Sequence, residues 1–456
     1  MIHRIVPPTV VLICLILGKA LFPESYKLFA AFGLCFWLLY WWISGAVSLG
    51  ITSLIPLFYV PLTGIADFSE ISQRYANPVI FLFLGGFLLA LALEKHELHQ
   101  WLARKMLYLT GNSPRSKILG ILFTSAAMSM WISNTATALI MLPIAIQYAK
   151  EQENIGKRAL LSVAFGANIG GIATLVGTPP NLFLAAYVRE QYNYKIDFIT
   201  WMSIGLPVAL LLLIAVGVIL LQGIGNETPS NSKVESPPIL SANQKKVGGV
   251  FLGVALLWIF KPFIEPLLGG VSIDDAAIAL GGVVLLAVIP DSTNNKALVN
   301  HQIIKDVPWD IILLFGGGMS LAFAMQNSGM IDLLIGGLPT TNYHAIVWIA
   351  IAAAIGIFAT EILSNIALVA AILPYLEHIA TKTSWHFMIL AVPLIIGASC
   401  AFMLPIATPP NAIVFASGKL RVSDMIKVGW KINAIAFIII SLSCYFILEK
   451  MGILIF

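Results

Sequence analysis

The sequence is poor in charged residues. Asp, Glu, Lys and Arg make up 11% of the 456 residues, whereas hydrophobic residues make up 59%. Soluble domains carry about 25% charged residues, so this chain has too little charge to cover a surface that faces water. The composition excludes an ordinary soluble globular protein and predicts an all-α polytopic membrane protein that forms one folding unit.

The chain also lacks the residue clusters of a disulfide-rich, metal-binding or catalytic protein. Its four cysteines (Cys14, Cys35, Cys400 and Cys444) lie in apolar runs without metal-ligand spacing, so we expect small core residues. The seven histidines show no ligand spacing such as H-E-x-x-H. The net charge of +4 says little by itself, and we expect no nucleic-acid partner. A membrane-embedded enzyme would need a nucleophile–base pair or a metal cluster, and the sequence supplies neither.

Apolar windows long enough to span a bilayer, about 20 residues each, recur along the chain. They lie near 5–22, 28–46, 48–62, 78–94, 116–148, 159–188, 203–224, 247–264, 273–290, 309–337, 345–376, 386–418 and 429–449. The first window has a basic start, as a signal peptide would, but Lys19–Pro23 is a poor cleavage site, so we interpret it as the first spanning segment. Residues 95–110 place Lys, Arg and His among Leu and Met, which predicts a helix along the membrane interface.

Two short polar stretches stand out from this apolar background. Residues 129–135 read SMWISNT and residues 360–366 read TEILSNI, and each is followed nine residues after its Asn by a proline, Pro143 or Pro374. Each is also followed by a Thr-Pro-Pro-Asn tetrad, at 178–181 and at 408–411.

These landmarks repeat at a nearly constant offset. The Ser-Asn pairs are 365 − 134 = 231 residues apart, the tetrads are 408 − 178 = 230 apart, and the glycine-containing stretches 84–87 and 315–318 are again 231 apart. Chance recurrence of small residues could explain the glycines, but not two tetrads in register with two Ser-Asn pairs. We infer an internal duplication, with a first half at 1–224, a polar linker at 225–246 and a second half at 247–456.

The regions that hold the Ser-Asn pairs are too long for one plain span and have polar centres. Polar backbone cannot face lipid, so we predict two re-entrant hairpins, at about 113–148 and about 343–380, with Ser-Asn near each tip. Basic residues flank the first hairpin on both sides, whereas only Lys382 lies near the second. The positive-inside rule therefore predicts that the first opens from the cytoplasm and the second from the outside.

Tracing the chain from a cytoplasmic N-terminus gives about 11 transmembrane helices plus the two hairpins. An odd number leaves the C-terminus outside and inverts the second half relative to the first, which is the inverted-repeat architecture of secondary transporters. The expected location is a bacterial-type inner (plasma) membrane. Of 26 Lys and Arg, 18 fall inside: Arg4, Lys95, Arg104, Lys105, Arg115, Lys117, Lys150, Lys157, Arg158, Lys233, Lys245, Lys246, Lys296, Lys305, Lys419, Arg421, Lys427 and Lys431.

The four motifs offer ligands for both a cation and an anion. A broken helix exposes carbonyl groups on one side of the break and N–H groups on the other. Carbonyl, hydroxyl and Asn oxygens suit a small alkali cation, and N–H, hydroxyl and amide donors suit a carboxylate. No Lys or Arg lies in any motif, so an anion would depend on co-bound cations for its compensating charge. The alternative is that Ser, Thr and Asn only bond neighbouring helices.

The paired Ser-Asn hairpins and the two Thr-Pro-Pro-Asn loops resemble the divalent anion:sodium symporter family, which carries di- and tricarboxylates and sulfate. Residues 408–429 are especially similar to that family, and the resemblance covers essentially the whole chain. It implies a homodimeric elevator transporter in the lipid bilayer, with co-transported sodium ions and no organic cofactor.

The resemblance also implies site residues. Sodium site 1 would use Ser129, Ser133, Asn134 and Gly177. Sodium site 2 would use Thr360, Leu363, Asn365 and Ala407, with Leu363 and Ala407 acting through their backbones. The substrate would meet Ser133, Asn134, Thr135, Thr178 and Pro179 from one half and Ser364, Asn365, Thr408 and Pro409 from the other.

Two residues in the second motif are unusual for such a site. Ile366 stands where the family often has Thr, which removes a hydroxyl donor from one end of the substrate site. Glu361 is a carboxylate at membrane depth and could couple protons or bind a cation, although we favour an aqueous hairpin mouth or a helix cap. Four aspartates at predicted span ends are interpreted as solvated: Asp274, Asp275, Asp310 and Asp332.

The leading hypothesis is a secondary active transporter that imports a dicarboxylate such as succinate, malate or fumarate, or a related divalent anion, with sodium. The nearest alternative is a sodium-independent exchanger of organic anions with the same fold, and a sulfate or tricarboxylate carrier is a variant of the first. An arsenite or proton-coupled carrier is more distant, with Glu361 as its only support. A receptor or scaffold would not need duplicated polar breaks.

Overall fold

The computed structural model describes residues 2–111, 113–151, 153–224, 236–293, 296–330, 333, 343–383 and 385–452. Three features of the sequence analysis lie outside them: the start of the linker with Lys233, Asp332, and the last residues of the chain. Within the described residues the chain is built from helices, with one isolated β-bridge between Pro290 and Ala297 and no strand. The prediction of an all-α protein is confirmed.

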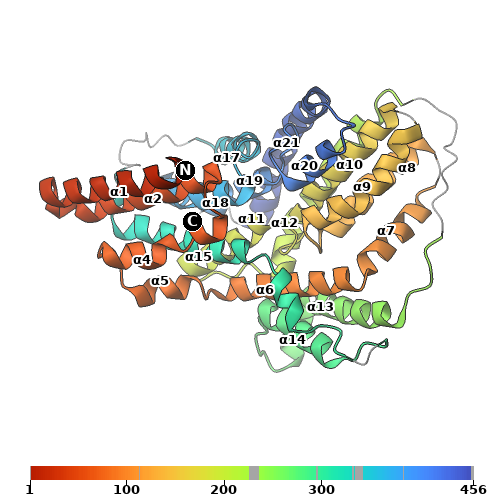
Figure 1. Ribbon diagram of the computed structural model, residues 1–456, viewed down its shortest axis with the longest axis horizontal. Coiled ribbons are helices and arrows are strands. Elements are labelled where there is room, and N and C mark those ends of the chain that lie inside the picture. Colours follow the sequence, from red (N-terminus) through yellow and green to blue (C-terminus); the bar gives the residue numbers. More distant parts are fainter. Residues whose placement is uncertain are drawn as a thin grey trace.

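The first half contains twelve described α-helices (Figure 1). They are α1 (Ile2–Leu21), α2 (Tyr26–Ser44), α3 (Leu49–Thr52), α4 (Ile55–Leu62), α5 (Phe68–Arg74), α6 (Pro78–Lys95), α7 (Leu98–Leu109), α8 (Pro114–Ser129), α9 (Asn134–Glu151), α10 (Glu153–Ile172), α11 (Pro179–Tyr192) and α12 (Phe198–Leu221). A 3₁₀ turn, η1 (Pro23–Ser25), joins α1 to α2.

The second half continues this series. Its described helices are α13 (Ala242–Leu267), α14 (Asp275–Val288), η2 (His301–Asp306), α15 (Trp309–Asn327), α17 (Ala345–Ala359), α18 (Asn365–Thr383), α19 (Met388–Ala398), α20 (Pro409–Ala416) and α21 (Val422–Lys450). Ser241 caps the N-terminus of α13 by accepting a hydrogen bond from the Gln244 N–H. Residues 242–246 are therefore helical, and the linker is shorter than the predicted 225–246.

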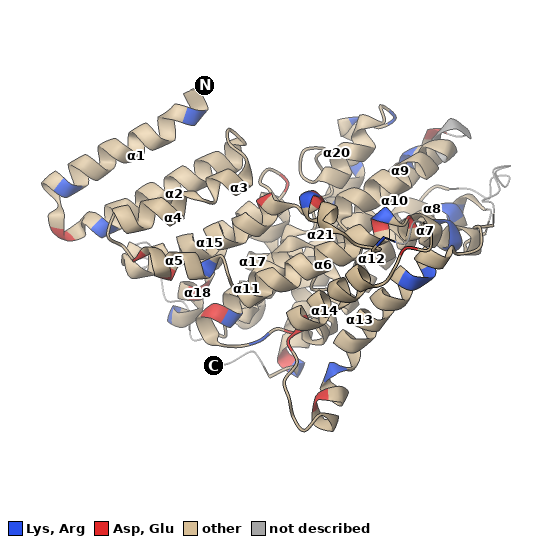
Figure 2. Cartoon of the chain, turned by 60° about the horizontal axis from the view of Figure 1, so that its bottom comes forward, with Lys and Arg blue, Asp and Glu red and all other residues tan. Residues whose placement is uncertain are grey.

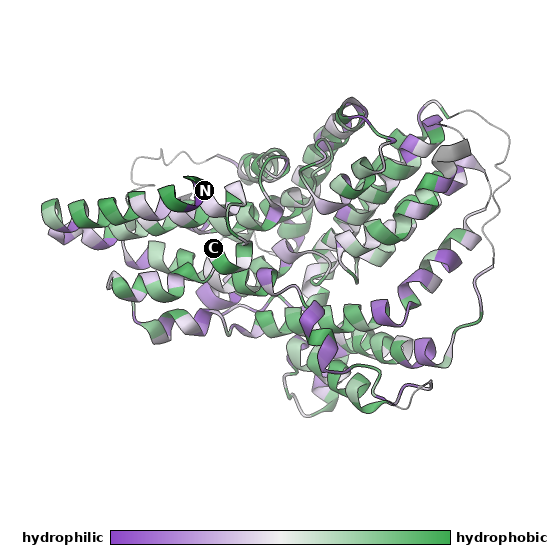
Figure 3. Ribbon diagram, in the orientation of Figure 1, coloured by the Kyte–Doolittle hydropathy of each residue, from purple (hydrophilic) through white to green (hydrophobic). Residues whose placement is uncertain are grey.

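The helices are apolar enough to cross a membrane. Among the described residues, seven are at least 18 residues long and sufficiently apolar, and five shorter apolar helices of 10–17 residues accompany them. Hydrophobic residues dominate their length (Figure 3), and charged residues gather at helix ends and connections (Figure 2). The chain is thus a polytopic membrane protein, whereas the number of about 11 crossings stays a prediction.

Two of the most buried helices in the core, α10 and α19, occupy matching positions in the two halves. In α10 every residue from Ala159 to Ile172 is buried, and in α19 every residue is buried. Each packs closely on the first helix of a predicted hairpin through glycine. A Cβ on Gly170 would lie 2.2 Å from the carbonyl oxygen of Ala126 in α8, and a Cβ on Gly356 would lie 2.5 Å from that of Leu394 in α19.

Both predicted hairpins consist of two helices joined by a short tip. The chain leaves α8 at Ser129 and enters α9 at Asn134, and it leaves α17 at Ala359 and enters α18 at Asn365. The Ser-Asn pairs therefore lie where the two helices of each predicted hairpin join. Whether the hairpins are re-entrant, and from which face, stays a prediction.

The core helices are interrupted where the Thr-Pro-Pro-Asn tetrads predict breaks. The chain is non-helical between α10 and α11 and between α19 and α20. Thr178 and Thr408 have extended backbones, with φ of −145° and −141°, and a proline follows each at the first position of the next helix. Proline lacks an N–H but has the φ that a helix start requires, so it ends one segment and begins another.

The interpretation of the span-end aspartates as solvated is wrong for Asp275, whereas Asp310 is exposed as expected and Asp274 is partly exposed. Asp275 is 2% exposed, and its Oδ1 lies 2.5 Å from the Nζ of the buried Lys261. Asp274 pairs with Arg189, and Asp310 accepts a hydrogen bond from the Gly50 N–H. All three lie at a helix start, as the sequence indicated, and of the three Asp275 is the buried one.

Candidate functional site

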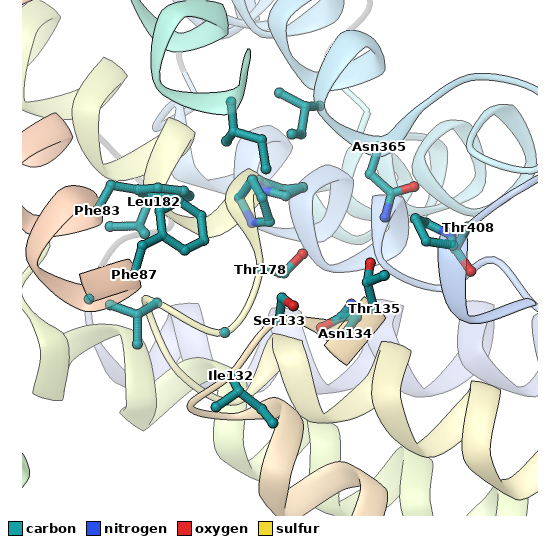
Figure 4. Close-up of a pocket in the computed structure, with 18 of the residues that line it drawn as sticks. Phe83, Phe87, Ile132, Ser133, Asn134, Thr135, Thr178, Leu182, Asn365 and Thr408 are labelled. Atoms are coloured by element: carbon teal, nitrogen blue, oxygen red, sulfur yellow. The ribbon is translucent and has the colours of Figure 1, made fainter. Parts of the chain in front are cut away.

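The two hairpin tips and the two helix breaks meet around one cavity of about 270 Å³. Figure 4 shows polar side chains from all four motifs around it. Eleven of the predicted site residues line this cavity: Ser133, Asn134, Thr135, Gly177, Thr178, Pro179, Ser364, Asn365, Ala407, Thr408 and Pro409. The other three predicted residues, Ser129, Thr360 and Leu363, are not in its lining.

Ser129 and Thr360 do not line the cavity, but each donates a hydrogen bond to the Asn side chain of its own hairpin tip. The Ser129 hydroxyl donates to Oδ1 of Asn134 at 2.6 Å, and the Thr360 hydroxyl donates to Oδ1 of Asn365 at 2.7 Å. Both hydroxyl residues are completely buried. Each tip thus contains the same hydrogen bond, between a hydroxyl residue and the Asn five positions later. This bond fixes the Asn side chain and leaves its NH₂ group available to a ligand.

The serine before each Asn is also oriented as a donor. The hydroxyl oxygen of Ser133 accepts from the Ala136 N–H at 3.1 Å, and that of Ser364 accepts from the Ala367 N–H at 3.2 Å. Since the backbone occupies the oxygen as an acceptor, each hydroxyl hydrogen can be donated toward the cavity.

The tetrad asparagines hold the helix breaks together. Asn181 Nδ2 donates to the carbonyl oxygens of Gly171 and Thr174, at 3.0 and 2.8 Å. Asn411 Nδ2 donates to those of Ala401 and Leu404, both at 3.0 Å. The acceptors differ by the same 230 residues as the donors, so the duplication extends to the hydrogen bonds. The sequence predicted the tetrads but not this role of their asparagines.

The first tip and the first break approach each other closely. A Cβ on Gly171 would lie 2.9 Å from Oδ1 of Asn134 and 3.1 Å from the carbonyl oxygen of Gly177. A Cβ on Gly177 would lie 2.6 Å from the carbonyl oxygen of Gly171. Only glycine fits at both positions. The approach gathers neutral oxygen atoms, which are ligands that an alkali cation accepts.

Asn168 joins the two halves at the second break, and sequence reasoning missed it. Its Nδ2 lies 3.1 Å from both the Ala401 carbonyl oxygen and the Thr408 hydroxyl, while its Oδ1 is buried without a hydrogen-bond partner. The Thr408 oxygen also accepts from the Asn411 N–H, so its hydroxyl hydrogen remains available. No motif contains Asn168, and only its position in an otherwise apolar stretch could have indicated it.

Glu361 is buried and is used as an acceptor. It is 4% exposed, and its Oε1 accepts from the N–H groups of Phe402 and Met403 and from Asn433 Nδ2, while its Oε2 accepts from the Leu404 N–H, all at 2.8–3.0 Å. The carboxylate caps the exposed amides of the second helix break. These N–H groups lie in the non-helical segment between α19 and α20, so Glu361 neither caps a helix nor faces an aqueous mouth, and both predicted placements are wrong.

One wall of the cavity is apolar. It includes Phe83 and Phe87 of α6 and Leu182 of α11, which lie together on one side of the polar groups in Figure 4. Ile366 also lines the cavity and is 9% exposed, at the position that corresponds to Thr135 in the first half. The polar groups of the two halves are therefore unequal in number.

Comparison with known proteins identifies the family. A family model described as citrate transporter matches residues 39–395. The sodium-dependent dicarboxylate transporter SdcS of Staphylococcus saprophyticus is 33% identical over 472 residues, and the protein of the same name from Staphylococcus aureus is 33% identical over 474 residues. Each alignment covers 96% of this chain and 91% of the relative.

Solved structures support the fold. The YdaH transporter of Alcanivorax borkumensis has a TM-score of 0.57 at 11% identity, covering 84% of this chain and 88% of that chain. MtrF of Neisseria gonorrhoeae, described with a class of antimetabolite efflux pumps, has a TM-score of 0.57 at 12% identity, covering 89% of this chain and 96% of that chain. The resemblance inferred from the Ser-Asn hairpins and the tetrads is confirmed by the curated relatives. This chain belongs to the citrate transporter family and is an integral membrane transport protein, not an enzyme.

Proposed function

We propose that the protein is a secondary active transporter that imports a dicarboxylate, such as succinate, malate or fumarate, together with sodium. The observation that carries the proposal is the cavity where the two hairpin tips and the two helix breaks meet. The names of the relatives in Staphylococcus, sodium-dependent dicarboxylate transporters, point to the same substrate class and the same ion.

The polar part of the cavity suits an anion. Ser133 and Ser364 each offer a hydroxyl hydrogen, Asn134 and Asn365 each offer an NH₂ group, and Thr408 offers a fifth donor. Donors come from both halves, so they can bind the two ends of a short dianion. Thr135, Thr178, Pro179 and Pro409 complete the proposed substrate contacts.

Charge compensation makes sodium coupling a physical requirement of this site. No Lys or Arg is among the described residues that line the cavity. A dianion that leaves water for such a site loses hydration energy that neutral donors replace only in part. Two cations bound beside it would supply the missing charge, and they would be released with it on the other side of the membrane.

The proposed cation sites lie on either side of the substrate. Site 1 consists of Ser129, Ser133, Asn134 and Gly177, where the first tip and the first break approach each other. Site 2 consists of Thr360, Leu363, Asn365 and Ala407. Its support is the matching Thr360–Asn365 hydrogen bond and the matching break.

The architecture that fits this function is an inverted repeat in a homodimer that works by an elevator mechanism. The hydrogen bonds repeated at an offset of 230 residues support two structurally equivalent halves. The placement of basic residues supports a cytoplasmic N-terminus, an external C-terminus and opposite membrane faces for the two hairpins.

Uptake by proteoliposomes tests the function directly. Purified protein would be reconstituted, and the uptake of labelled succinate, citrate and sulfate would be measured with and without an inward sodium gradient. We expect succinate uptake that collapses without the gradient. If none of the three anions enters, the proposed transport function is wrong.

A sodium-independent exchanger of organic anions is the second candidate, because the same cavity could exchange one dianion for another. Counterflow separates the two functions: vesicles loaded with unlabelled succinate are placed in labelled succinate with sodium or with choline. Counterflow that is equally fast in choline would favour the exchanger. A strict need for sodium would favour the symporter.

A further inference from the structure

A second polar cavity lies away from the substrate site, where α10, α12 and α21 meet. It has a volume of about 340 Å³, and its charged lining residues are Lys157 and Arg158 of α10 and Asp424, Lys427 and Lys431 of α21. We refer to this set as the basic pocket. Basic residues near α10 and α21 are visible among the uncharged helices in Figure 2. All four cations belong to the residues that the sequence assigns to the cytoplasmic face.

The basic pocket has an excess of positive charge. Lys157 already pairs with Glu153 at 2.9 Å and with Asp424 at 3.3 Å, and Arg158 donates to the carbonyl oxygen of Leu220 at 2.5 Å. The lining therefore holds four cations and one carboxylate, a net charge of +3. Lys157 and Arg158 are held in place by these contacts and form a fixed side of the pocket.

Lys427 and Lys431 form the opposite side and are available to a ligand. Both are exposed, and within the described part of the chain neither has a recorded ion-pair or hydrogen-bond partner. They are four residues apart in α21, so their side chains lie on the same helix face. Like charges at this spacing repel each other, and an anion between them and Lys157 would relieve the repulsion.

Apolar residues line part of the basic pocket, and other apolar residues are exposed on one of its helices. Leu161, Ile219 and Val428 are part of its lining. Beyond them α12 exposes Ile214 and Val218, at 58% and 59%, which are one turn apart on the same helix face. A soluble anion would leave this apolar strip uncovered, whereas a ligand with an anionic head and acyl chains would cover both parts.

The position relative to the membrane agrees with such a ligand. Trp430 of α21 is 55% exposed and lies between the two lysines in sequence. Tryptophan on the outside of a membrane helix is enriched at the level of the lipid headgroups. Basic pockets between helices on the cytoplasmic side bind the headgroups of anionic lipids.

We propose that the basic pocket binds an anionic phospholipid, with the phosphate among Lys157, Lys427 and Lys431 and the acyl chains along α12. The lipid would connect α10 of the first half with α21 of the second half. It would thereby reinforce the link that the Lys157–Asp424 ion pair already makes between the two helices, and it would offset the excess positive charge there.

Lipid binding to the purified full-length protein tests the proposal. Native mass spectrometry would measure the binding of added phosphatidylglycerol and phosphatidylcholine to the wild-type protein and to the double variant Lys427→Gln/Lys431→Gln. Each lysine near a membrane surface contributes about fivefold to anionic lipid binding, so the double variant should bind phosphatidylglycerol about 30-fold more weakly. Phosphatidylcholine binding should not change.

A matched control keeps the change in charge and moves it out of the pocket. Lys305→Gln/Lys419→Gln removes two exposed lysines that the sequence also assigns to the cytoplasmic face. This control should retain wild-type binding of phosphatidylglycerol. All four lysines are exposed, so both variants should fold, and gel filtration with thermal unfolding checks that they do.

Three results would overturn the proposal. The first is equal binding of phosphatidylglycerol and phosphatidylcholine by the wild-type protein. The second is an equal loss in the control and in the pocket variant, which would mean that only the general surface charge matters. The third is complete displacement of phosphatidylglycerol by excess inorganic phosphate, which would assign the pocket to a soluble anion. None of these results depends on which substrate the protein transports.

Discussion

Replacing Glu361 with glutamine should destabilise the second helix break and lower transport. The carboxylate accepts four hydrogen bonds, three of them from consecutive backbone N–H groups at Phe402, Met403 and Leu404 and the fourth from Asn433. Glutamine has one acceptor oxygen and one NH₂ group in place of two acceptor oxygens. At least one of the four donors must therefore meet another donor.

The size of the effect follows from the geometry. If the glutamine oxygen occupies the position of Oε1, it keeps three bonds, but each weakens by about 1 kcal/mol because the acceptor is now neutral. The Leu404 N–H then faces the NH₂ group and is left unsatisfied, which costs a further 1–3 kcal/mol or so. A total of about 4–6 kcal/mol is a large share of the usual stability of about 5–15 kcal/mol.

Two measurements check this reasoning. Thermal unfolding of Glu361→Gln in detergent should show a midpoint lower by roughly 5 °C. Sodium-driven uptake per folded molecule should also fall, because Leu404 is three residues before Ala407 of proposed site 2. Glu449→Gln, an exposed position on α21, should change neither quantity. A wild-type midpoint and wild-type uptake in Glu361→Gln would refute the capping role.

Four further substitutions test other parts of the molecule. Asn134→Ala and Asn365→Ala should each abolish coupled uptake while the protein remains folded by gel filtration, and wild-type uptake in either would exclude that residue from the site. Ile366→Thr should lower the KM for succinate about tenfold by adding one donor, Ile366→Val being the control that adds none, and an unchanged KM would contradict the idea that this end lacks a donor. Lys261→Met leaves Asp275 buried without its cation and should cost about 3–5 kcal/mol in thermal unfolding. The double variant Lys261→Met/Asp275→Leu should recover most of that loss, and a single variant as stable as wild type would show that the pair contributes little.

The hairpin tips and helix breaks could be predicted from the sequence because their causes are local. Proline at the start of α11 and α20 has no N–H to continue the preceding helix, and a threonine before it takes an extended backbone. The duplication then predicted that all four motifs form one site, because matching positions in two equivalent halves can lie around a shared centre.

Contacts between distant parts of the chain could not be predicted in this way. The donors to Glu361 lie 41 to 72 residues away, and Asn168 meets Thr408 across 240 residues. No periodicity or spacing encodes such distances. Lys261 and Asp275 are only 14 residues apart, but the sequence does not show that another helix covers them, so Asp275 was interpreted as solvated.

The two halves fasten each hairpin tip to its helix break by different chemistry. In the first half the Thr174 hydroxyl donates to the Met130 carbonyl oxygen at 2.5 Å. The residue that corresponds to Met130 is 130 + 231 = 361, and there the Glu361 carboxylate accepts four hydrogen bonds. The second break is therefore fixed more firmly. A negative charge is also buried one residue from Thr360 of proposed site 2, whereas site 1 has an uncharged methionine at that position. Because a buried charge acts through a low dielectric constant, the two proposed cation sites should differ in affinity although their hydrogen bonds match.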